Sequence, residues 1–205
     1  MDWTVALTAL VLIVPVELPD KTFVATLVLA TRYRPLLVWI GVGLAFFVQT
    51  LVAVTAGGLI SRLPHGPVVA FAAVMFLIGG IVLLRGAKKA DEEEAETEAE
   101  FGAKVTGPAT GWRAVLASFT VLFVAEWGDL SQLLTAGLVV RTKDPLSVFV
   151  GAWVGLLLVS ALGAVAGRAL LKRVRLATVQ RIGGGVCLLL ALVCALQAAG
   201  VDLPI

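Results

Sequence analysis

Residues 114–140 read AVLASFTVLFVAEWGDLSQLLTAGLVV, and residues 3–30 read WTVALTALVLIVPVELPDKTFVATLVLA. Each stretch is long and apolar enough to cross a bilayer as a helix, which takes roughly 20 residues. Each nevertheless carries two carboxylates near its middle. A carboxylate at mid-membrane is costly and is retained where it has a function. These two stretches therefore predict a membrane protein with buried acidic chemistry.

The composition of the whole chain agrees with this interpretation. Of its 205 residues, 60% are apolar, and the mean hydropathy is +1.01. Soluble domains are usually about 45–50% apolar. Prolines, glycines and charged residues separate four further apolar stretches from the first two. We therefore expect an all-α integral membrane protein with six transmembrane helices, at 3–30, 36–60, 67–85, 114–140, 146–170 and 178–200.

The two halves of the chain repeat each other. Five polar residues of the first half recur 109 residues later with the same or a similar side chain: Glu17, Asp20, Thr22, Thr26 and Arg32 return as Glu126, Asp129, Ser131, Thr135 and Arg141. Each half has three expected spans, and an odd number inserts the second half upside down. We expect an inverted repeat, with one three-helix unit at 1–85, an acidic connection at 86–113 and the second unit at 114–205.

Basic residues predict how the chain is oriented. Three expected connections, 32–34, 86–113 and 168–181, hold twelve of the sixteen Lys and Arg residues when Arg85 is counted with them. Basic residues favour the cytoplasmic side. We therefore expect residues 86–113 in the cytoplasm and both termini outside. Short loops and an excess of arginine favour a bacterial plasma membrane. Met1-Asp2-Trp3 carries no basic residue, so we expect the first apolar stretch to be a span and not a signal peptide.

The connection contains an acidic run at 91–100, in which seven of ten residues are Asp or Glu. Such a run repels itself and is typical of a solvated linker. An alternative is that its field concentrates cations near the mouth of a pore.

The four carboxylates inside apolar stretches have a regular spacing. Glu17 and Asp20 are three residues apart, as are Glu126 and Asp129, so each pair projects from one helix face. Burying four carboxylates costs about 10 kcal/mol, and hydrogen bonds between membrane helices, worth about 0.6 kcal/mol each, do not offset that cost. Oxygen ligands suit hard cations such as Ca²⁺, Mg²⁺ and Mn²⁺. The predicted metal ligands are Glu17, Asp20, Thr22, Glu126, Asp129, Ser131 and Gln132.

Both motifs also contain helix breakers: Pro15 and Pro19 in the first half, and Gly128 in the second. Carbonyls freed by such breaks are tolerated in a membrane where they line a cavity. Lys21 lies four residues after Glu17 and is expected to balance charge, whereas its counterpart is Leu130. Crowded carboxylates take up protons when no cation is present, because like charges disfavour ionisation. Metal and protons would then compete for one site, as in an antiporter.

The sequences ELPDKT at 17–22 and EWGDLS at 126–131 resemble the twin Glu-x-Gly-Asp-[Lys/Arg]-[Thr/Ser] signature of the Golgi-type manganese/calcium transporter family, a relative of the lysine-exporter superfamily. The resemblance covers nearly the whole chain, with departures at Pro19 and Leu130. It implies a cation/proton exchanger that removes manganese or calcium from the cytoplasm. It also implies that the Glu, Asp and Thr/Ser residues of the two motifs hold the cation.

We therefore expect a transporter for metal homeostasis, which exports Mn²⁺, or Ca²⁺, in exchange for protons. It is expected not to be an enzyme and to have no resident cofactor and no nucleic-acid partner. One alternative is an exporter of an amino acid or another small organic cation, which would need a roomier cavity. A metal-dependent enzyme acting on lipid phosphates is disfavoured, because neither motif contains Arg or His. A non-transporting scaffold is disfavoured by the cost of burying the carboxylates.

Overall fold

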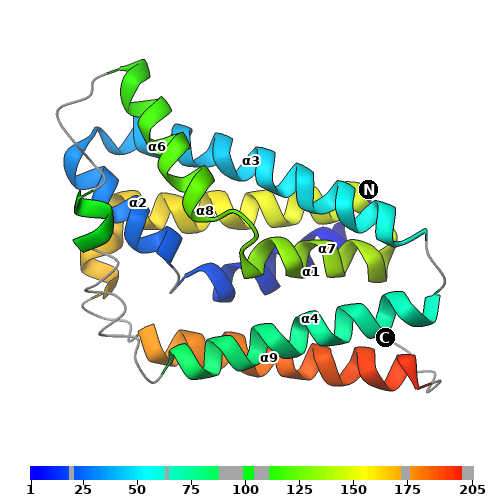
Figure 1. Ribbon diagram of the computed structural model, residues 1–205. Coiled ribbons are helices and arrows are strands. Elements are labelled where there is room, and N and C mark those ends of the chain that lie inside the picture. The colour runs from blue at the N-terminus through cyan, green and yellow to red at the C-terminus, as the bar shows by residue number, and fades with distance from the viewer. Residues whose placement is uncertain (19–20, 63–64, 88–98, 104–110, 172–175, 200–205) are drawn as a thin grey trace.

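The computed structural model describes residues 1–18, 21–62, 65–87, 99–103, 111–171 and 176–199. Within these ranges the chain is helical and has no strands, which confirms the all-helical prediction (Figure 1). Residues 99–103 form a short helical segment. The longer elements are α1 (Trp3–Glu17), α2 (Lys21–Arg32), α3 (Pro35–Ile60), α4 (His65–Gly86), α6 (Trp112–Ala125), α7 (Leu130–Thr142), α8 (Pro145–Leu171) and α9 (Leu176–Ala198).

Among the described residues, three helices are long and apolar enough to cross a membrane alone: Pro35–Ile60, Pro145–Val165 and Arg181–Ala198. Two helix pairs pass the same test together, α1 with α2 and α6 with α7, and each pair is bent by 72°. If each bent pair crosses the membrane as one broken span, the described residues therefore contain up to five spans. The expected spans at 3–30 and 114–140 are these bent pairs. The expected span at 67–85 falls on α4, whose described apolar part is the shorter helix Ala70–Gly86. The count of six spans stays a prediction.

Asp2 starts α1 and ties it to α8. Its carboxylate accepts the amide of Thr4 at 2.8 Å, as an N-cap does. Its own amide donates to Oγ of Ser147 at 2.7 Å and to Oδ2 of Asp144 at 3.3 Å. The hydroxyl and the amide of Ser147 both donate to Asp144, and these hydrogen bonds lower the pKa of that carboxyl. The start of α1 and the α7–α8 connection therefore lie at one end of the molecule.

The two halves are interlocked. Helix α3 of the first half packs against α6 and α7 of the second, and α8 of the second half packs against α1 and α2 of the first. A Cβ added to Gly41 would overlap the carbonyl oxygen of Val115, and one added to Gly151 would overlap that of Ala6. Val115 and Ala6 are 109 residues apart and so correspond in the repeat. Small residues that let backbones touch are typical of membrane helix contacts.

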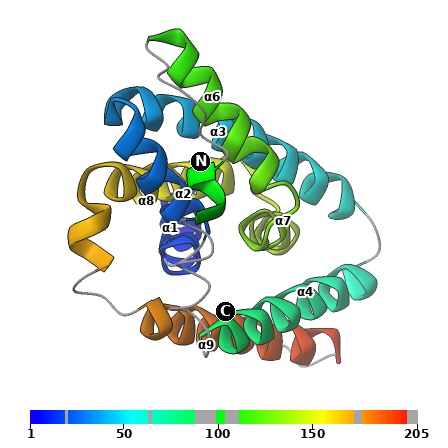
Figure 2. The ribbon, with the colours of Figure 1, turned by 60° about the vertical axis from the view of Figure 1, so that its left-hand side comes forward.

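Helices α4 and α9 pack along each other and form a separate layer below the other helices (Figures 1 and 2). This layer contacts α1 and α7. The contact is apolar and includes Val16 of α1, Phe76 of α4, Leu134 of α7 and Cys187 of α9, each of them buried. The core thus continues from the interlocked helices into the second layer.

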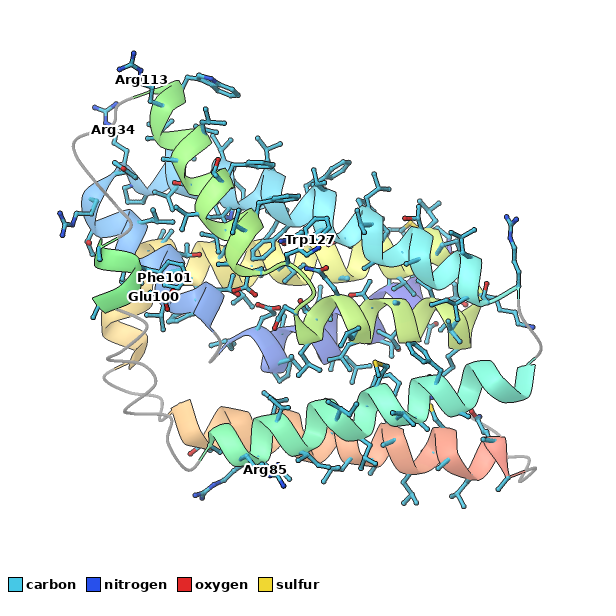
Figure 3. The ribbon with its side chains drawn as sticks, viewed as in Figure 1. Arg34, Arg85, Glu100, Phe101, Arg113 and Trp127 are labelled. Atoms are coloured by element: carbon cyan, nitrogen blue, oxygen red, sulfur yellow. The ribbon has the colours of Figure 1, made fainter. Side chains whose placement is uncertain are left out.

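The acidic run at 91–100 is described only at Ala99 and Glu100, and both are exposed. The next residue, Phe101, is only 2% exposed and belongs to the same core cluster as Val24 and Val28 of α2. Figure 3 shows Glu100 and Phe101 beside α2, at the end of the bundle that also carries Arg34, Arg85 and Arg113. Burial of its large apolar ring accounts for this packing. The connection is therefore attached to the bundle at this point.

Candidate metal centre

Three carboxylates from the two halves meet inside the molecule. Glu17 ends α1, Glu126 directly follows α6 and Asp129 directly precedes α7. One carboxylate oxygen of each lies within 4.8 Å of the others. Glu17 and Glu126 are buried, at 1% and 3% exposed, and Asp129 is half-buried. Residues that are 109 positions apart in the sequence therefore converge on one point.

The spacing of these oxygens fits a bound cation. Oxygen ligands lie about 2.0–2.6 Å from Mg²⁺ or Ca²⁺, so ligands on opposite sides of an ion are about 4–5 Å apart. The three oxygens fall within that span. Three carboxylates at this spacing also repel one another, and a bound cation offsets that repulsion. The arrangement is therefore suited to hold a hard divalent ion.

The hydroxyls predicted to join the site are also buried. Thr22 and Ser131 are 1% and 6% exposed. The residues one turn further on, Thr26 and Thr135, donate their hydroxyls to the carbonyls of Thr22 and Ser131, both at 2.7 Å. The Thr22 hydroxyl makes no hydrogen bond with the described part of the chain. The two half-sites therefore share one local pattern of hydrogen bonds.

The break between α6 and α7 is held by its own side chains. Gly128 has φ +81°, a conformation that favours glycine. Asp129 caps α7 by accepting the amide of Ser131 at 3.4 Å. Gln132 donates its side-chain amide to the carbonyl of Glu126 and accepts the amide of Gly128 at 3.3 Å. Gln132 thus binds the backbone of the break, and its predicted role as a metal ligand stays a prediction.

Part of the first motif lies outside the residues that the structure describes. Pro19 and Asp20 are not among the described residues, nor is the side chain of Lys21. The predicted roles of these three residues stay predictions. Helix α1 runs through Pro15 and ends at Glu17, so the helix ends two residues after this proline rather than at it.

One buried polar residue beside the site was not predicted. Gln49 of α3 is 2% exposed, and its Nε2 donates to the carbonyl of Phe123 at 3.1 Å, in the last turn of α6. The signal available in the sequence was a lone amide side chain in the middle of the apolar stretch at 36–60.

Two bent apolar helix pairs that bring buried carboxylates together form the arrangement found in secondary transporters. The family model for the divalent cation/proton antiporter GDT1 matches residues 5–91 and 114–202. The chain belongs to that family, which confirms the resemblance seen in the two motifs. The family is one of transporters, in agreement with the prediction that the chain is not an enzyme.

Curated relatives support this assignment. GDT1-like protein sll0615 of Synechocystis is 32% identical over 194 residues, which cover 90% of this chain and 93% of the relative. GDT1-like protein 3 of Oryza sativa subsp. indica is 30% identical and matches 82% of this chain but 65% of its own length. The chloroplast protein PAM71 of Arabidopsis thaliana is 32% identical over 68% of this chain and 42% of the relative. The chain thus spans less than two thirds of these plant relatives. No solved structure matches it significantly.

Proposed function

We propose that this protein exports Mn²⁺, or Ca²⁺, from the cytoplasm in exchange for protons, through one cation site that both halves share. The site comprises Glu17 and Asp20 from the first motif and Glu126 and Asp129 from the second, with the hydroxyls of Thr22 and Ser131 beside them. The observation that carries the proposal is the convergence of three of these carboxylates within 4.8 Å. Membership of an antiporter family for divalent cations supports it.

Charge balance gives the reason for exchange. Four carboxylates and Lys21 carry a net charge of about −3 when fully ionised, and a divalent ion reduces it to about −1. An empty site lowers its charge by taking up protons instead, because closely spaced carboxylates do not all stay ionised in a dry interior. The ion and the protons therefore exclude each other, so that one leaves when the other binds.

The proposed architecture gives this site access to both sides in turn. Six spans form two inverted three-helix units, at 1–85 and 114–205, joined by the connection at 86–113. The interlocking of α3 with α6 and α7, and of α8 with α1 and α2, supports such a repeat. In secondary transporters with inverted repeats, the site lies where the halves meet, and one part rocks against the other.

The proposed orientation of the protein in the membrane follows from the distribution of its basic residues. Residues 86–113 face the cytoplasm, and both termini face outside, in a bacterial plasma membrane. Arg34, Arg85 and Arg113 lie at one end of the bundle (Figure 3), which supports this orientation. A cyanobacterial relative that the chain covers almost fully supports a bacterial membrane.

An exporter of an amino acid or another organic cation is the alternative, and two observations weigh against it. Three carboxylate oxygens within 4.8 Å leave room for a bare ion rather than for a substituted ammonium group. Trp127, the one aromatic residue of the two motifs at 17–22 and 126–131, is 59% exposed and contacts Phe123 with tilted rings at a centroid distance of 5.0 Å. It does not enclose a cavity for a larger substrate.

Transport by the purified protein in liposomes tests the proposal. Uptake of Mn²⁺, Ca²⁺ and Mg²⁺ is measured with and without an imposed pH gradient, with lysine as the organic competitor. We expect Mn²⁺ or Ca²⁺ uptake that a pH gradient of the opposing direction accelerates and that lysine does not inhibit. Cation uptake insensitive to the pH gradient, or uptake of lysine in place of a metal, would contradict the proposal.

A further inference from the structure

The two helix breaks are bent by the same 72° but are held in different ways. Val14 and Phe123 occupy corresponding positions, 109 residues apart. The carbonyl of Val14 accepts the backbone amide of Leu18 at 2.9 Å, so the helical pattern continues to that residue. The carbonyl of Phe123 accepts Nε2 of Gln49 at 3.1 Å. A side chain from another helix thus takes the place of a backbone donor in the second half.

The packing of α3 on α6 fixes where Gln49 reaches. Gly41 lies against Val115 of α6, so closely that a Cβ would overlap its carbonyl oxygen. Gln49 and Phe123 each follow these residues by eight positions, a little over two helical turns. The close contact at Gly41 therefore sets the register that brings the amide of Gln49 to the carbonyl of Phe123.

At the first helix break, the residue that corresponds to Gln49 has no group able to make such a contact. Gly151 lies against Ala6 as Gly41 lies against Val115. The residue eight positions after Gly151 is Val159, which is 1% exposed and has no hydrogen-bonding side chain. Likewise, Phe23 is the residue of the first half that corresponds in the repeat to Gln132. The amide side chains that hold the second break therefore have apolar counterparts in the first.

We propose that Gln49 is a positioning residue for the cation site. By donating a hydrogen bond to the carbonyl of Phe123, Gln49 ends α6 one residue before Glu126. It thereby fixes the backbone from which the Glu126 carboxylate projects. Glu126 has φ −102° and ψ 13°, whereas Leu18 at the end of α1 has helical angles of −59° and −33°. Gln132 acts on the same turn from the other side, through the carbonyl of Glu126.

The physical reason is that a carbonyl in a dry interior has to find a donor. Without Gln49, the amide of Trp127 is the nearest backbone donor in sequence for Phe123, as Leu18 is for Val14. Forming that bond would bring Glu126 into helical geometry and so change the direction in which its carboxylate projects. A displacement of this kind weakens ion binding, because the site depends on converging oxygens.

The test rests on the proposed function and measures Mn²⁺ affinity by calorimetry on the purified full chain. Gln49→Met keeps the volume of the side chain but removes the donor. We expect its Kd to rise about tenfold, equivalent to about 1.4 kcal/mol, with little change in melting temperature and with one ion still bound. The matched control is Val159→Ala at the corresponding position of α8. It should lower the melting temperature through lost packing, yet keep Kd within twofold.

Gln49→Asn provides a second variant, because it keeps an amide that is too short to reach Phe123. It should weaken Mn²⁺ binding as Gln49→Met does. A Kd within twofold of wild type in either folded variant would overturn the proposal. Failure of both variants to fold would also overturn it, since Gln49 would then support the fold rather than the site. Absence of divalent-ion binding by the wild type would refute the proposed function itself, a separate outcome.

Discussion

At the scale of single residues, the account rests on where the carboxylates lie. Glu17, Glu126 and Asp129 are placed at the ends of helices. Burial makes their charges costly in the absence of a cation and makes them strong ligands in its presence.

Neutralising one of these carboxylates tests its role directly. Glu126→Gln retains the shape of the side chain but replaces a charged ligand with a neutral one, which a hard divalent ion binds less tightly. We expect Mn²⁺ affinity to fall by about 100-fold and transport to be abolished, while the protein level in the membrane is unchanged. Transport assays in liposomes check this, with the exposed Glu100→Gln as control. Normal transport by Glu126→Gln would exclude this residue from the site.

At the scale of helices, close backbone contacts keep the two halves in register. Gly41 of α3 lies against α6 and Gly151 of α8 lies against α1, so that α3 and α8 support the two bent pairs through corresponding contacts. A side chain at either position would push these helices apart. The position of the carboxylates therefore depends on residues more than two turns away from them.

Gly41→Ala should destabilise the protein by about 1–3 kcal/mol, because the new methyl group would overlap the backbone of α6. Gly58→Ala in the same helix is the matched control, since its Cβ would meet no atom within 4 Å. In the control, the helix propensity gained should stabilise the protein by up to about 1 kcal/mol. Thermal unfolding of both variants in detergent measures the difference. Equal melting temperatures for the two would show that the contact at Gly41 is not tight.

At the scale of the whole molecule, the sequence predicted the all-helical fold and the family, and the inverted repeat of six spans stays a prediction. The recurrence of Glu17 as Glu126 predicts a shared site, because the binding site of a transporter with inverted repeats lies at the interface between its two halves. Gln49 was missed for a physical reason. Its partner is a backbone carbonyl on a different helix, and no sequence pattern specifies which carbonyl a helix break leaves open. Phe101 was also missed, since its neighbours are acidic and suggested a solvated segment throughout.

Thiol labelling tests the proposed orientation of the protein in the membrane. Thr97→Cys places a thiol in the connection expected to face the cytoplasm, and the native Cys187 and Cys194 are each 1% exposed, which keeps background labelling low. We expect an impermeant thiol reagent to label position 97 only after intact cells are permeabilised. Labelling without permeabilisation would place this connection outside and invert the proposed topology.

The central claim is that both halves form one site at which a cation and protons compete. Calorimetry of Mn²⁺ binding, from about pH 5 to pH 8, on the wild type, Asp20→Asn and Asp129→Asn tests it most directly. The account predicts one ion per wild-type chain, an affinity that falls as the pH falls, and loss of the same binding event in each variant. Binding that does not depend on pH would contradict the competition. Two binding events, one lost in each variant, would contradict the shared site.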